Sequence, residues 1–243
     1  MLFLHGGGVS GWMWRPVVAQ LAGTVRSIVP DLPGHGTSSS VEYTSHDDAV
    51  DRLVALIRDR AQNGVTVVGF SLGAQLALRL AADHPSLVRA ALIISGETVP
   101  APAQAATLAL LRASAPLARR EWFARLQAKQ LGVPETLLER YIEDSRAMTT
   151  DTLVASVREN IGFTLPEGWR RFAGPAAVVV GARERGLMRK SADLTHEALP
   201  HSSLVVVPDA AHDAPLTRPD RIADEVRRLL AQAEAGRTGS DAS

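Results

Sequence analysis

The sequence predicts an α/β fold: a doubly wound, mostly parallel sheet with an inserted helical cap. Three observations indicate this class. Short apolar, β-branched runs alternate with segments of helical periodicity along most of the 243 residues. Residues 65–85 contain a strand, a tight glycine turn and a helix in direct succession. Residues 99–173, by contrast, contain no β-branched run and only helical periodicity.

The first sixty residues predict two strands and two helices joined by glycine-rich loops. Residues 2–4 end a strand that leads into His5-Gly6-Gly7-Gly8, where the glycines allow backbone N–H groups to approach a ligand closely. A helix is expected over residues 12–22, because their apolar side chains recur at i, i+3, i+4 and i+7. Residues 25–29 are predicted as a second strand, and residues 44–61 as an amphipathic helix.

The stretch over residues 65–85 places a serine at its turn. Residues 65–68 suit a buried strand, and the apolar residues after Gly73 keep a helical period until Pro85, where a helix must stop. Between them lies the pentad Gly69-Phe70-Ser71-Leu72-Gly73. Its turn is so sharp that a side chain at either glycine would collide with the neighbouring strand or helix. Ser71 therefore protrudes at the start of the helix, in the geometry called a nucleophile elbow.

The rest of the chain predicts further strands, with a helical insertion between two of them. Strands are expected at residues 90–94, 176–180 and 204–207, and helices at residues 191–199 and 219–233. Inside the insertion, prolines separate helices near residues 104–112, 119–130, 135–146 and 150–160. The predicted organisation is a core of residues 1–98 and 174–234, a cap of residues 99–173 and a disordered tail of residues 235–243.

Composition limits the possible partners and cofactors. Lys plus Arg and Asp plus Glu both number 26, so the net charge is zero, which disfavours nucleic acid and anionic membranes as partners. The absence of cysteine excludes disulfides and thiolate chemistry, and no histidine pair has metal-ligand spacing with carboxylates. No apolar run approaches the ~20 residues that span a bilayer. We therefore expect a cytoplasmic protein without metal or cofactor that acts on a small molecule.

The residues of chemical interest follow predicted strands, where open parallel sheets bind their ligands. Ser71 needs a base to remove its proton, and His212, in the loop after the last strand, is the best of the seven histidines. Glu184 follows the strand at residues 176–180 and is the candidate acid that orients this histidine. Because Arg183 and Arg185 flank it, an ordinary surface ion pair is the alternative interpretation.

Other residues could complete the site. Glu97 follows the strand at residues 90–94 and could reach the same histidine, whereas the two nearby carboxylates, Asp209 and Asp213, are weaker choices. An oxyanion would need two preset backbone N–H donors. One is expected from Leu72, directly after the serine, and the other from the glycine loop, Gly7 first and Gly8 next.

As a set, these residues resemble the α/β-hydrolase family. The matching segments are HGGGVSGWMW at the N-terminus, DLPGHGTS at residues 31–38, GFSLG at the elbow, VVVGARE at residues 178–184 and AAHDAPLTRPDRIADEV near the C-terminus. The resemblance covers residues 1–98 and 174–234. It implies serine-dependent hydrolysis through an acyl-enzyme, beneath a helical cap.

Two features depart from the family pattern. Glu184 stands where the family usually has Asp, although some branches use Glu. The family also has two further strands before the HG loop, whereas this sequence begins at the strand of that loop. We therefore expect either a truncated sequence or a smaller sheet with an exposed edge, through which a homo-oligomer could form.

The expected function is hydrolysis of a carboxylic ester, or a related acyl bond, of a small and largely apolar molecule. A lyase or carbon–carbon bond hydrolase on the same scaffold, and a catalytically silent ligand-binding protein, are the alternatives. Apolar cap residues such as Trp122 and Phe123 are expected to set chain-length preference. No basic cluster points at the site, so a phosphate- or CoA-bearing substrate is not expected.

Overall fold

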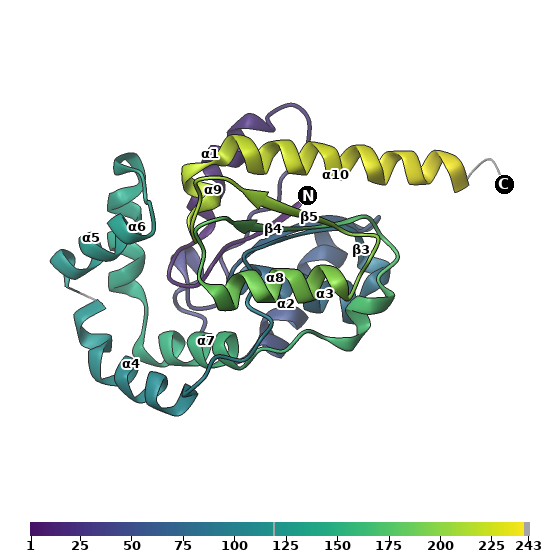
Figure 1. Ribbon diagram of the computed structural model, residues 1–243. Coiled ribbons are helices and arrows are strands. Elements are labelled where there is room, and N and C mark those ends of the chain that lie inside the picture. Colours follow the sequence, from purple (N-terminus) through teal and green to yellow (C-terminus); the bar gives the residue numbers. More distant parts are fainter. Residues whose placement is uncertain (119, 241–243) are drawn as a thin grey trace.

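Five of the six predicted strands pair into one parallel sheet with helices on both faces (Figure 1), which confirms the predicted fold class. The computed structural model describes residues 1–118 and 120–240. The strands lie side by side in chain order: β1 (Leu2–Leu4), β2 (Val65–Phe70), β3 (Val88–Ile94), β4 (Ala176–Gly181) and β5 (Ser203–Val207). All six residues of β2 are buried, as expected of a central strand covered on both faces.

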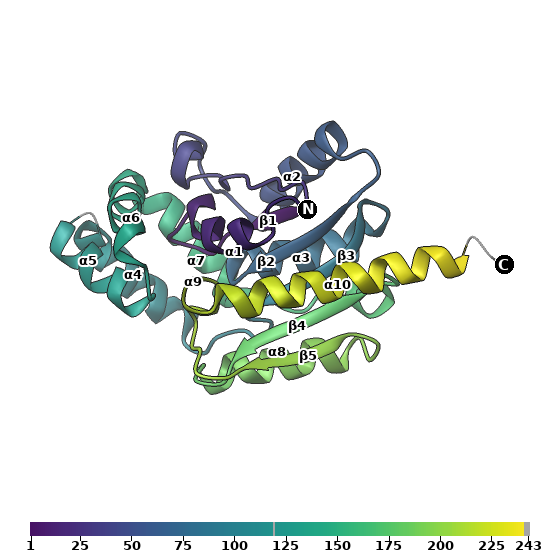
Figure 2. The same ribbon diagram turned by 90° about the horizontal axis from the view of Figure 1, so that it is seen from above.

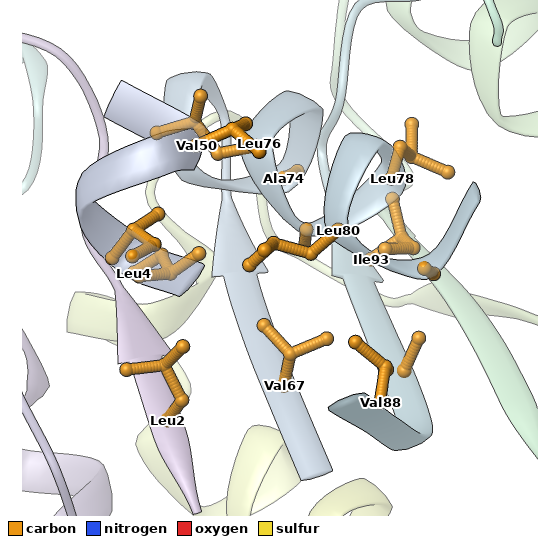
Figure 3. Close-up of a cluster of buried hydrophobic side chains, with 14 of the residues drawn as sticks. Leu2, Leu4, Val50, Val67, Ala74, Leu76, Leu78, Leu80, Val88 and Ile93 are labelled. Carbon is orange, nitrogen blue, oxygen red and sulfur yellow. The ribbon is translucent and has the colours of Figure 1, made fainter. Parts of the chain in front are cut away.

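The side chains of each strand alternate between two helical layers. Val67 faces α2 (His46–Arg60) and α3 (Leu72–Asp83), and Figure 3 shows it among the buried side chains of β1, β3 and α3. Val68 belongs to the opposite cluster, with α1 (Arg15–Gln20) and α10 (Pro219–Ser240). A further helix, α8 (Gly186–Glu197), packs on β4 on the same side of the sheet as α3 (Figure 1).

The edge of the sheet beside β1 differs from the prediction. Residues 25–29 do not form a strand; Ile28 alone pairs with Leu2 in an isolated parallel bridge. The Phe3 N–H donates to the Ile28 carbonyl at 2.9 Å, and the Ile28 N–H donates to the Met1 carbonyl at 2.7 Å. Because β1 has only three residues, it offers no longer ladder to a neighbour. The segment around Ile28 therefore covers part of the outer edge of β1.

A short 3₁₀ turn interrupts one predicted helix. The helix predicted over residues 12–22 divides into a 3₁₀ helix, Gly11–Trp14, and α1, because Pro16 lies at the first turn of α1 and has no N–H to donate. Three other 3₁₀ helices are Gly36–Ser38, Pro85–Leu87 and Glu167–Arg171.

In the described part of the chain, four α-helices lie between β3 and β4. They are α4 (Gln104–Ala118), α5 (Glu121–Gln130), α6 (Glu135–Ala147) and α7 (Thr150–Gly162), close to the predicted ranges. Pro116 lies inside α4, although the sequence predicts that the prolines of the insertion separate its helices. Figures 1 and 2 show α4, α5 and α6 grouped beyond one end of the sheet, on the side of the short α9 (Ala214–Thr217). The boundaries of a separate cap domain stay a prediction.

Hydrogen bonds between side chains and backbone carbonyls, and one between two side chains, join this insertion to the core. Gln75 of α3 is fully buried, and its Nε2 donates to the Glu97 carbonyl at 2.7 Å and to the Asn160 carbonyl at 3.1 Å. These two partners lie near the start and the end of the insertion, so one side chain holds both. Further out, the Trp12 indole N–H donates to Asp144 Oδ2 of α6 at 2.7 Å. The insertion is thus held against the end of the sheet where the candidate residues lie.

The prediction for the C-terminus is also wrong for most of its residues. The sequence predicts a disordered tail over residues 235–243, but α10 continues to Ser240. Ala, Gln and Glu residues after Leu230 are good helix formers and extend the helix. Residues 241–243 lie outside the described residues. None of the helices in the described ranges is long and apolar enough to cross a membrane.

Candidate active site

The turn between β2 and α3 is the sharp elbow that its glycines require. Ser71 has φ 53° and ψ −114°, and its N–H donates to the Ile94 carbonyl at 2.9 Å. A Cβ on Gly69 would lie 2.2 Å from the Gly73 carbonyl oxygen, and a Cβ on Gly73 would lie 2.2 Å from the Leu4 carbonyl oxygen. Both contacts are far too short for real atoms. The strained Ser71 backbone is therefore held by neighbours that tolerate glycine alone on either side.

Ser71, His212 and Glu184 come together at the carboxyl ends of the strands. His212 Nε2 lies 3.0 Å from Ser71 Oγ, and His212 Nδ1 lies 3.0 Å from Glu184 Oε2. The imidazole ring packs on the Phe70 ring, with centroids 4.9 Å apart. One hydrogen bond thus joins Ser71 and His212, which are 141 positions apart in the sequence. With a carboxylate on Nδ1, the imidazole is set to donate from Nδ1 and accept at Nε2.

Glu184 is buried, and every polar contact it makes suits an ionised carboxylate. Its side chain is 1% exposed, against 37% for His212. The Ser95 hydroxyl donates to Oε1, and the Gly181 N–H reaches the same oxygen at 3.3 Å. Burial by itself raises the pKa of the Glu184 carboxyl, but the hydrogen bond and charge of His212, with the Ser95 hydrogen bond, outweigh it and hold the pKa below its ordinary value.

The competing carboxylates have different partners. Arg183 pairs with Asp209 at 2.6 Å, so the surface ion pair suggested for Glu184 is wrong. Asp213 Oδ1 accepts the Ala211 N–H at 3.0 Å. Glu97 makes no hydrogen bond to His212; its buried Oε1 lacks a partner among the described residues, and burial raises the pKa of its carboxyl. Of these acids, only Glu184 contacts the imidazole.

Sequence reasoning missed Ser95. Its backbone has φ 52°, and its hydroxyl holds the carboxylate oxygen of Glu184 that faces away from His212. The available signal was positional: Ser95 directly follows the strand predicted at residues 90–94, at the same sheet edge as Ser71. A serine there has no distinctive motif, so only the structure identifies its partner.

The glycine loop lies directly beside the elbow. A Cβ on Gly7 would contact Leu72 Cβ at 4.0 Å, and within the described chain the N–H groups of Gly7 and Leu72 have no hydrogen-bond partner. His5 braces the loop: the Leu32 N–H donates to His5 Nε2 at 2.9 Å, and His5 Nδ1 contacts the Gly6 carbonyl at 2.8 Å. Burial, with the nearby His35, lowers the pKa of His5 to about 3, so its ring is neutral.

A cavity of about 210 Å³ lies between this loop and the inserted helices. Gly7 and Gly8 form one wall, and residues of α4, α5, α6 and α7 form the others. Phe123 lines the cavity, in agreement with the expectation for that side chain. Trp122 does not: this residue is 61% exposed, because α5 buries the face that carries Ala124 and Ala128. Among the described residues, no cluster of three or more potential ligands could hold a metal ion.

Comparison with known proteins agrees with the fold. A profile of the alpha/beta hydrolase family matches residues 1–225. An AB hydrolase superfamily protein of Gibberella zeae is 42% identical over 98 residues; that match covers 40% of this chain and 34% of the relative.

Two similar proteins match over most of their length. A pimeloyl-[acyl-carrier protein] methyl ester esterase of Nitrosomonas europaea is 25% identical over 91% of both chains. A 2-succinyl-6-hydroxy-2,4-cyclohexadiene-1-carboxylate synthase of Serratia proteamaculans is 29% identical over 95% of this chain and 92% of the relative. The structure of a bromoperoxidase from Bacillus anthracis superposes with a TM-score of 0.83 at 18% identity, covering 95% of this chain and 91% of that one. Since the family profile spans nearly the whole sequence and the fold agrees with it, this chain belongs to the alpha/beta hydrolase family.

Proposed function

We propose that this protein is a serine hydrolase that cleaves a carboxylic ester, or a related acyl bond, of a small and largely apolar substrate through an acyl-enzyme. One observation carries the proposal: two consecutive 3.0 Å contacts link Ser71 Oγ through His212 to the buried Glu184. The name of the Nitrosomonas relative, a methyl ester esterase, supports the same reaction class.

In the proposed acylation step, Ser71 Oγ attacks the carbonyl carbon of the ester while His212 Nε2 accepts the hydroxyl proton. The tetrahedral intermediate collapses as the carbon–oxygen bond to the alcohol breaks, and His212 returns the proton to the departing oxygen. Glu184 keeps the imidazole oriented and stabilises its positive charge. A water molecule then attacks the acyl-enzyme by the same proton path, which releases the acid and restores Ser71.

The negative oxygen of the intermediate needs donors that are already in position. Leu72 begins α3, so its unpaired N–H lies at the positive end of a twelve-residue helix. The Gly7 N–H comes from the facing loop, which His5 braces against Leu32. We assign these two groups as the oxyanion donors, with Gly8 as the next candidate in the loop.

A lyase or carbon–carbon bond hydrolase that reuses Ser71 and His212 is the second candidate function. The Serratia relative, which is named a synthase and is 29% identical over 95% of this chain, supports this second candidate. The two candidates differ in what they leave behind, because only the ester hydrolase forms an acyl-enzyme from a simple alkyl ester.

The test is a screen of chromogenic esters of graded acyl length with wild type and Ser71→Ala. We expect turnover that Ser71→Ala reduces by on the order of 10⁶-fold. An organophosphonate should label Ser71, which mass spectrometry of the peptide would locate. The matched control is Ser40→Ala, an exposed serine in a turn, which should keep full activity. Label on another serine, or activity that survives Ser71→Ala, would refute the proposal.

A further inference from the structure

The cavity beside Gly7 contains no charge. Its described lining residues are glycine, alanine, leucine, methionine, serine, threonine, glutamine, phenylalanine and tyrosine. A carboxylate placed there would lose its water without gaining a cation, which is strongly unfavourable. The chemistry of the lining therefore disfavours acyl groups that carry a negative charge.

The cavity is not uniformly apolar. Besides the N–H groups of the glycine loop and the exposed Thr150 hydroxyl, it contains one side-chain amide that is free to bind. The Ser145 hydroxyl donates to the Tyr141 carbonyl at 2.8 Å, and the Ser114 hydroxyl donates to carbonyls of its own helix. The Tyr141 hydroxyl points to Gln127 Oε1 at 3.5 Å. The Gln127 amide N–H₂ has no partner among the described residues, so it remains available to an oxygen atom.

The size of the cavity sets the length of the group it can hold. About 210 Å³ accommodates roughly seven atoms or groups of the size of water, at ~30 Å³ each. Four helices and the glycine loop line this partly open space, which suits the part of the substrate that stays attached to Ser71 until water attacks. The alcohol, in contrast, must leave before deacylation.

We propose that the cavity holds a short, uncharged acyl group with a neutral oxygen acceptor, a ketone or an ether, that binds the Gln127 amide. This inference rests on the proposed function. An acyl group without that oxygen leaves the amide unpaired, and one with a carboxylate at the same place brings an unpaired charge. Gln127 is then the residue that determines specificity at the end of the acyl chain.

Three methyl esters of nearly equal shape test this inference: 4-oxopentanoate, 4-methylpentanoate and hydrogen succinate. They place a ketone, a methyl group and a carboxylate at the same distance from the ester. With wild type we expect kcat/KM for the ketone to exceed that for the methyl analogue by about tenfold, from one neutral hydrogen bond. We expect the carboxylate to be at least about 100-fold slower than the methyl analogue.

Variants at position 127 make the test specific. Gln127→Met keeps the shape but removes the amide, so the ratio of ketone to methyl ester should fall to about one. Gln127→Lys should raise kcat/KM for hydrogen succinate by at least about tenfold, a gain that structural damage would not produce. The matched control is Gln130→Met, in the same helix but exposed and outside the cavity; it should keep the wild-type ratio.

Calorimetric binding of the same three esters to Ser71→Ala separates this inference from the proposed function. If wild type does not turn over but the ketone binds tightest, the proposed function fails and the description of the cavity stands. If all three esters are cleaved equally, or if Gln127→Met keeps the ketone preference, the inference is wrong while the hydrolase function stands.

Discussion

The variant Glu184→Gln tests whether an ionised Glu184 accepts a hydrogen bond from His212 Nδ1. Glu184 accepts from three donors: His212 Nδ1, the Ser95 hydroxyl and the Gly181 N–H. An amide has only one oxygen. The Gly181 N–H is fixed in the backbone, so the oxygen of Gln would stay on that side and the NH₂ would face His212. The imidazole would then accept at Nδ1 and carry its proton on Nε2, where it could not take the proton of Ser71.

The expected loss of activity follows from that tautomer. A triad whose acid is replaced by its amide loses about 10⁴-fold in kcat, which corresponds to ~5.5 kcal/mol of transition-state stabilisation. The assay is kcat/KM on the best ester of the screen, with the thermal midpoint of each variant as a check on folding. Glu184→Gln should fold, because the amide has nearly the same shape as the carboxyl.

Glu97→Gln is the matched control, since its carboxyl lies near the site but makes no hydrogen bond to His212. We expect it to change kcat/KM by less than about threefold, within the range of a group that does not contact the reacting residues. A loss of less than tenfold in Glu184→Gln, together with a large loss in Glu97→Gln, would assign the acid to Glu97 and refute the reasoning.

Further predictions concern folding, pH, specificity and assembly. Gly73→Ala would place a Cβ 2.2 Å from a carbonyl oxygen and should lower the free energy of unfolding, measured with urea, by more than about 3 kcal/mol. The control Gly186→Ala places its Cβ with no atom within 4 Å and should not destabilise the protein; equal urea midpoints for the two variants would contradict the elbow geometry. His5 has a pKa of about 3 against an ordinary 6.5, so the unfolded chain binds a proton that the folded one does not. The contribution of His5 to the free energy of unfolding should therefore fall by ~1.4 kcal/mol per pH unit as the pH drops from about 6.5 toward 3. A urea midpoint that does not change between pH 7 and 5 would argue against this prediction. Phe123→Ala should shift the preferred acyl length upward because it lines the cavity, whereas Trp122→Ala should not; a uniform change across the ester series would show that Phe123 only holds the helices together. Because Ile28 covers only part of the edge beyond β1, self-association through the remainder should appear as a concentration-dependent mass in analytical ultracentrifugation, and one monomer mass at all concentrations would count against it.

The sequence alone determined the features that depend on local chain geometry. A buried strand, two glycines spaced around Ser71 and a helix that ends at Pro85 predict the elbow, because the steric demands lie within a few residues. The alternation of strands and helices predicts the parallel sheet, because a helix that crosses over between two strands leaves them parallel. Since parallel strands end at one edge, their order also predicts that His212 lies near Ser71, although the two are 141 positions apart in the sequence.

Only the tertiary structure decided which side chains meet and which way they face. Glu97 and Glu184 both follow strands, and the choice between them depends on two loops packing around His212, which no local pattern encodes. The partners of Arg183 and Ser95 and the exposure of Trp122 depend in the same way on neighbours distant in sequence. The strand expected at residues 25–29 reduces to one bridge at Ile28, because the length of a ladder is set by both strands and β1 has three residues.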